Sequence, residues 1–111
     1  MEIRENDATC IFTPLDPILG KLESKRLLPF ISQEKREVAL DLSMVSDCTI
    51  GFIEGLKEIS QKKNIGIFNI PQDMFVLFNV MGIDKSIKLF VSELDFLDNT
   101  RRLINRKFTV I

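Results

Sequence analysis

The fold is decided by residues 36–43, which read Arg-Glu-Val-Ala-Leu-Asp-Leu-Ser. The apolar side chains of Val38, Leu40 and Leu42 share one face of an extended chain, because side chains alternate along a strand. This alternation is typical of a β-strand with one buried face. The other face carries Asp41, which is unusual inside a strand. We expect Asp41 either to face solvent at the end of the sheet or to cap the following loop.

A second strand is predicted at residues 65–70, where the sequence Ile-Gly-Ile-Phe-Asn-Ile is apolar almost throughout. Continuous apolar runs are typical of central strands that are buried on both faces. Between the two strands, residues 49–63 place Ile53, Leu56 and Ile59 on one stripe of a helix. A strand, helix, strand order of this kind favours parallel pairing of the two strands.

The remaining elements extend this central unit on both sides. We expect further strands at 2–5, 8–13 and 87–91 and further helices at 17–31, 72–81 and 92–107. Asp16 would cap the helix at 17–31, and Pro17 suits its first position. The alternation of strands and helices predicts an α/β layer architecture. The length of 111 residues fits a single domain, residues 1–111.

The composition excludes several kinds of chemistry. The chain has 42 Ile, Leu, Phe and Val residues but no His, so catalysis by imidazole is excluded. Cys10 and Cys48 cannot form a four-ligand zinc site without His partners, and we interpret them as reduced thiols. The five glycines match neither the dinucleotide-binding pattern nor the P-loop spacing. We therefore expect no enzyme activity, no metal and no cofactor.

Charge and hydropathy bound the location and the partners. A formal net charge of −1 argues against a surface that binds nucleic acid. No stretch approaches the roughly 18 apolar residues of a membrane-spanning helix. Residues 1–5, Met-Glu-Ile-Arg-Glu, do not resemble a signal peptide. The sequence therefore predicts a cytoplasmic protein without direct membrane insertion.

Some apolar side chains exceed what the predicted helices need for the core. Near the start of the 49–63 helix, Ile50 can join the buried stripe, whereas Phe52 projects away from it. A Phe in this place either contacts a partner or packs beneath a loop.

The 72–81 helix shows a larger surplus. When one stripe of this helix is buried, the apolar side chains of Phe75, Val76 and Val80 lie outside it. A helix that is apolar on most of its circumference is either deeply buried or docks another surface, and both interpretations stay open here.

The order of these elements resembles the STAS domain family (sulphate transporter and anti-sigma factor antagonist) over residues 38–91. The strand at 38–43, followed by Met44 and Val45, is similar to the family's strand pattern "vvlDlsgV". Residues 81–84, Met-Gly-Ile-Asp, end a segment similar to "llxltGld". The resemblance implies an α/β fold with a small mixed β-sheet of four to five strands, flanked by about four helices, that acts as a binding module.

In anti-sigma factor antagonists of this family, an Asp-Ser-Ser-Gly motif is phosphorylated by a partner kinase, which is also the anti-sigma factor. By the resemblance, the motif falls on residues 49–52, which read Thr-Ile-Gly-Phe. Gly51 stands at the phosphoacceptor position and cannot be phosphorylated, so no phosphoacceptor is expected. Ser46 and Thr49 are weak candidates, since either one can simply cap the helix.

The leading hypothesis is a non-catalytic module that docks a regulatory protein, such as an anti-sigma factor or a kinase-like regulator, in bacterial transcription control. The contact residues would be Asp47, Thr49, Ile50, Gly51 and Phe52. An apolar first turn suits docking that no phosphate can interrupt.

Two alternatives remain. The chain could be an accessory subunit bound to the ATPase of a membrane transporter, using the same surface. It could also form a homodimer through Phe75, Val76 and Val80.

Overall fold

The centre of the molecule is a five-stranded mixed sheet, in a computed structural model that describes residues 1–101. Its strands lie in the order β1 (Glu2–Glu5), β2 (Thr9–Thr13), β4 (Glu37–Asp41), β6 (Ile65–Phe68) and β7 (Lys88–Leu89). β1 pairs with β2 in the antiparallel sense, and all other neighbours in this sheet are parallel. The predicted α/β class with a small mixed sheet is therefore confirmed.

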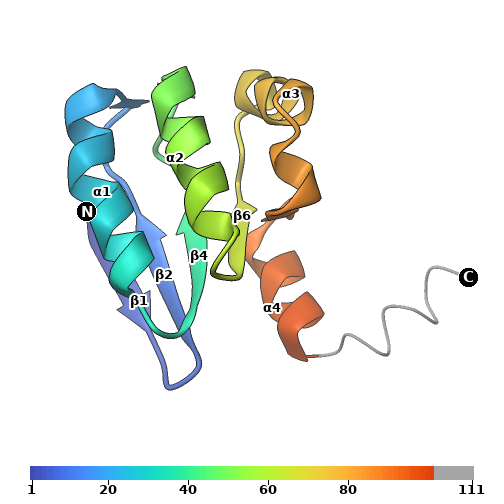
Figure 1. Cartoon of the computed structure of the whole chain (residues 1–111). Helices are drawn as coiled ribbons and strands as arrows, with labels where there is room; N and C mark the ends of the chain where they lie inside the picture. The colour runs from blue at the N-terminus through green and yellow to red at the C-terminus, as the bar shows by residue number, and fades with distance from the viewer. Residues whose placement is uncertain (102–111) are drawn as a thin grey trace, which may run out of the picture.

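Helices cover the two faces of the sheet unequally. The front face packs against α1 (Lys21–Gln33), α2 (Ile50–Ser60) and α3 (Gln72–Val80), and the back face packs against α4 (Glu93–Arg101). Figure 1 shows α1 and α2 side by side in front of the strands, with α3 beyond α2. A short 3-10 turn at Ile83–Lys85 leads from α3 to β7. The predicted helix end near Lys107 lies outside the described residues.

The alternation in β4 explains why both faces can be covered. Val38 and Leu40 belong to the front cluster, whereas Ala39 belongs to the back cluster and Asp41 follows on the same side. The side chains of β6 alternate between the two faces in the same way, and Ile67 belongs to the front cluster. The predicted division of side chains between two faces is correct, but the expectation of a single buried face is wrong, because α4 covers the second face.

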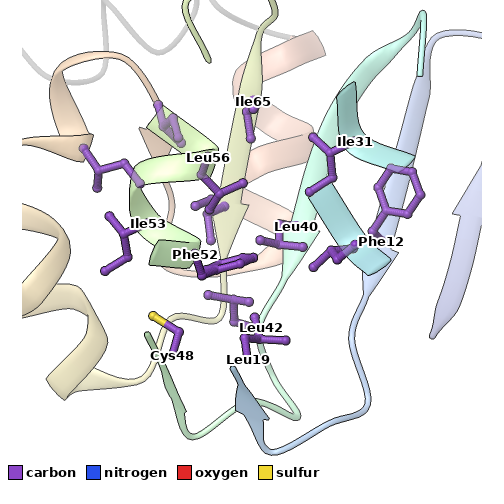
Figure 2. Packing of buried hydrophobic residues seen from close by; sticks show 14 of the residues in the cluster. Phe12, Leu19, Ile31, Leu40, Leu42, Cys48, Phe52, Ile53, Leu56 and Ile65 are labelled. Carbon is purple, nitrogen blue, oxygen red and sulfur yellow. The ribbon is translucent and has the colours of Figure 1, made fainter. Parts of the chain in front are cut away.

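The front cluster contains Phe52 at its centre. This side chain is completely buried, in one cluster with Leu19, Leu40 and Leu42. Figure 2 shows it reaching from α2 toward the side chains of β4. Full burial of a side chain of this size stabilises the fold by roughly 1.5–3 kcal/mol.

The first helix begins later than predicted. Pro17 does not open a helix, because its carbonyl oxygen accepts backbone N–H groups of Ser46 at 2.7 Å and Asp47 at 3.2 Å. The segment 18–19 instead forms β3 (Ile18–Leu19), which pairs in parallel with β5 (Asp47–Cys48). The helix starts at Lys21, after Gly20, so Asp16 is not its cap. Both strands of this pair were missed because their partners are distant in sequence.

Candidate docking surface

Three connections meet at one edge of the sheet. β2, β4 and β6 are parallel, so their carboxyl ends share an edge, and α1, α2 and α3 all begin there. Figure 1 shows the starts of α1 and α2 at the top of the molecule, next to α3. We call this region the carboxyl edge and define it as residues 14–20, 42–51 and 69–76. Binding sites of open α/β sheets occur at such edges.

The carboxyl edge exposes large apolar side chains in each of its three segments. Ile18, Met44 and Ile50 each keep slightly more than half of their surface in contact with solvent, at 57%, 56% and 57%. Leu15 and Phe75 are exposed as well. Single exposed apolar residues are ordinary, but several on connections that share one edge mark a surface suited to contact.

Thr49 fixes the start of α2 in this surface. Its Oγ1 accepts a hydrogen bond from the backbone N–H of Phe52 at 3.3 Å, as an N-cap does. Its backbone N–H donates to the carbonyl oxygen of Leu19 at 3.1 Å, and its hydroxyl lies 3.5 Å from the same oxygen. The interpretation of Thr49 as a helix cap is confirmed.

The structure exchanges the predicted roles of Ile50 and Phe52. The expectation that Phe52 projects from the surface is wrong, because its side chain is fully buried, whereas Ile50 is exposed. The alternative, packing of Phe52 beneath a loop, predicted burial correctly but not the place, because Phe52 belongs to the core cluster. Phe52 and Leu56 lie four residues apart, so they form a helical stripe as readily as Ile50 and Ile53 do. The larger apolar area of Phe was the signal that favours its burial.

The residues just before α2 divide into an exposed rim and a buried thiol. Ser46 and Asp47 are exposed, and Asp47 Oδ1 accepts the backbone N–H of Cys48 at 2.8 Å. Burial, helped by the Asp47 charge, raises the pKa of the Cys48 thiol to about 11. Burial therefore favours the protonated thiol, which is not the nucleophilic form.

A hollow runs along the outer side of the two neighbouring helices. Its upper part is lined by Lys21, Ser24, Lys25, Leu28, Pro29, Thr49 and Gly51. Its lower part is lined by Leu28, Pro29, Ser32, Gly55, Glu58, Ile59 and Lys62. The two parts are adjacent and meet at Leu28 and Pro29, and we call them together the α1–α2 groove. Its upper end opens onto the carboxyl edge at Gly51 and Thr49.

Asp41 caps the loop after β4 and is not available to a ligand. Its carboxylate accepts the backbone N–H of Ser43 at 3.0 Å and the side-chain amide of Asn69 at 3.1 Å. Thr13 Oγ1 lies at 3.5 Å and Arg4 Nη2 at 3.4 Å. Of the two predicted environments for Asp41, capping of the following loop is therefore the correct one.

The apolar surplus of α3 lies on the surface. Met74 and Phe78 are buried, whereas Phe75, Val76 and Val80 are exposed. The expectation that these three side chains exceed the needs of the core is confirmed. Their part in self-association stays a prediction.

Two classes of site are missing from the described part of the chain. Among residues 1–101, no group of three or more Cys, Asp or Glu side chains could hold a metal ion. The helices of this part of the chain are also too short or too polar to span a lipid bilayer.

Comparison with known proteins finds similarity in structure and none in sequence. No protein-family model and no curated protein matches the chain. A solved structure from Thermotoga maritima, described as an anti-sigma factor antagonist, superimposes with a TM-score of 0.77 at 12% identity. The match covers 91% of this chain and 94% of that one.

A second solved structure is the murine Solute Carrier 26 family member A9 anion transporter. It superimposes with a TM-score of 0.66 at 21% identity, over 83% of this chain. The chain spans only 17% of the length of that transporter. The resemblance seen in residues 38–91 is confirmed at the level of the fold, and the chain has the STAS fold.

Proposed function

We propose that the chain is a non-catalytic binding module that docks a regulatory protein through the carboxyl edge. The observation that carries the proposal is the exposed apolar set of Ile18, Met44 and Ile50 at the edge where three helices begin. Asp47, Thr49 and Gly51 border Ile50 and complete the contact surface. A protein partner suits this surface because exposed apolar side chains lie beside a polar rim that includes Ser46 and Asp47.

The proposed docking needs no phosphorylation switch. Gly51, at the family's phosphoacceptor position, has no hydroxyl group, and the Thr49 hydroxyl already serves as the helix cap. Ser46 is exposed and is the remaining weak candidate. A complex formed in this way would be constitutive. The regulator would be a cytoplasmic anti-sigma factor or a kinase-like protein. The description of the Thermotoga maritima neighbour as an anti-sigma factor antagonist supports this choice.

The test captures the partner and then measures its affinity for matched variants. Ile50→Asp places a charge in the apolar surface, and we expect at least tenfold weaker binding, or about 1.4 kcal/mol. Leu94→Asp is the control, since Leu94 is an exposed residue near the start of α4. Asp in a first helical turn is favourable, so both variants should fold. Equal affinities of the two variants would refute docking through the start of α2.

A transporter-associated role is the second candidate, favoured by the likeness to the anion transporter. In this case the chain would be an accessory subunit bound to the ATPase of a transporter. The same capture separates the two candidates by the identity of the protein that is recovered with the wild type and lost with Ile50→Asp. An ATPase component would support the transporter-associated role, and a sigma-regulating protein would support the first proposal.

Self-association through the exposed face of α3 is a separate proposal. Phe75, Val76 and Val80 would then be covered in a homodimer. Sedimentation should show a dimer at micromolar concentration that Val80→Asp converts to a monomer. A wild-type chain that stays monomeric at high micromolar concentration would exclude it.

A further inference from the structure

Two glycines on α2 face the α1–α2 groove, and only one of them is explained by the packing of this chain. A Cβ atom on Gly55 would clash with Leu28 Cδ1, so Gly55 allows α1 and α2 to approach. A Cβ atom on Gly51 would meet nothing closer than Thr49 Oγ1 at 3.9 Å. Gly51 is the second residue of α2, and no packing contact of the described chain requires a glycine there. Gly51 therefore leaves open space at the mouth of the groove without a benefit to the fold.

The charge of the groove differs from that of the whole chain. The chain has a net charge of −1, whereas the groove is lined by Lys21, Lys25 and Lys62 against the single acid Glu58. Within residues 1–101, the ion pairs are made by Arg4 and Arg36, so these lysines have no carboxylate partner there. The groove is thus a positive, partly apolar channel on a slightly acidic protein.

The shape of the groove selects a type of occupant. It lies between two helices, away from the sheet edges formed by β1 and β7, so a partner cannot add a strand to the sheet there. A proline-rich segment would need aromatic side chains, and none lines this groove. Another common mode places the apolar face of an amphipathic helix in a groove. Leu28, Pro29 and Ile59 offer the apolar floor, and the lysines offer contacts for acidic side chains.

We propose that the α1–α2 groove binds an acidic amphipathic helix of the partner protein. An apolar side chain of this helix would enter the space above Gly51, and its carboxylates would pair with Lys21 and Lys25. The inference rests on the proposed docking function and specifies the chemistry of the partner. It also gives Gly51 a role, which is to leave room for the partner's side chain.

The experiment selects peptides from a displayed library on the whole chain. Each peptide has about 16 residues, which is enough for a helix. The apolar stripe is fixed, and each of the remaining positions is either Glu or Lys. We expect the enriched peptides to carry Glu beside the apolar stripe and to bind more weakly at high salt. In a spectrum of the labelled chain, the enriched peptides should shift the backbone amides of Ser24, Lys25, Gly51 and Gly55.

Matched variants then test the two features separately. Lys21→Glu with Lys25→Glu should weaken binding of the acidic peptides at least tenfold, whereas Lys85→Glu with Lys88→Glu should leave it within twofold. Gly51→Leu fills the mouth and should weaken binding at least tenfold, with a thermal midpoint no lower than that of the wild type.

Three results would overturn the inference: no enriched binder, no acidic bias among the binders, or equal binding by the Lys21/Lys25 variant. Binding that is lost with Ile50→Asp but is insensitive to Lys21 and Lys25 would reject the groove and keep the docking function. The opposite result is that Ile50→Asp leaves binding of the native partner unchanged while the acidic peptides still bind in the groove. That result would reject docking at the start of α2 and keep the groove. A last outcome would also reject the peptide. If no peptide is enriched, and the chain binds anionic lipid vesicles in a way that the Lys21/Lys25 change abolishes, the occupant would be a membrane surface.

Discussion

The two faces of the central sheet are stabilised in different ways. Within residues 1–101, nineteen buried side chains form the front cluster, beneath α1, α2 and α3. The back cluster beneath α4 has four, namely Ile11, Ala39, Phe68 and Phe96. The back face adds a polar network in which Asp41 accepts bonds from Thr13, Ser43 and Asn69 and faces Arg4.

The difference shows that α4 is held by fewer apolar contacts and by charge. Arg4 on β1 donates to both carboxylate oxygens of Glu93 on α4, at 2.9 and 2.7 Å, and also reaches Asp41. Phe96 of α4 packs on Phe68 and edge-on against Phe90, with ring centroids 5.7 and 5.4 Å apart. The front face should therefore dominate global stability, and the back face should govern only the attachment of α4 and the loop after β4.

The largest effect is expected at the centre of the front face. Phe52→Ala removes a fully buried ring and leaves a cavity, so we expect a loss of about 3–5 kcal/mol of unfolding free energy. Urea unfolding measures it. Phe30→Ala is the matched control, since Phe30 on α1 is 54% exposed and its truncation should cost less than about 1 kcal/mol. Comparable losses in the two variants would contradict the burial of Phe52.

An intermediate effect is expected where the back face meets the carboxyl edge. Asp41→Ala leaves the Ser43 N–H and the Asn69 amide without their acceptor, which should cost about 1–3 kcal/mol. Asp41→Asn retains one acceptor oxygen and should cost less. If both substitutions cost the same, the charge facing Arg4 would be more important than the hydrogen bonds.

The smallest effect is expected from the ion pair between β1 and α4. Both side chains are partly exposed, at 42% for Arg4 and 33% for Glu93. A double-mutant cycle with Arg4→Gln and Glu93→Gln should give a coupling of about 0.2–1 kcal/mol. High salt should reduce it. A coupling above about 2 kcal/mol would mean that charge, rather than the Phe96 cluster, attaches α4.

The sequence predicted the elements whose patterns are local. Alternation in the central strand and the continuous run at 65–70 correspond to β4 and β6, and the stripe of Ile53 and Leu56 identified α2. β3 and β5 were missed, because two-residue strands have no period of their own and exist only through hydrogen bonds across about 30 positions of sequence.

Of the predicted contact residues, Asp47, Thr49, Ile50 and Gly51 are exposed and Phe52 is not, and their contact with a partner stays a prediction. Helical periodicity alone could not choose between Ile50 and Phe52 as the buried residue. The rotation of α2 about its axis is set by tertiary contacts, including the close approach of Gly55 to Leu28. The groove was not predicted, since it depends on the spacing between two helices that are distant in sequence.

The short pair of β3 and β5 has a consequence for the rate and the strength of binding. It ties the segment before α1 to the segment before α2, with backbone bonds from Ser46, Asp47 and Thr49 to Pro17 and Leu19. The two helix starts therefore move together, and the mouth of the groove keeps its width in the free protein. A partner would meet a preorganised site, so that little conformational entropy would be lost on association and no slow rearrangement would limit the encounter.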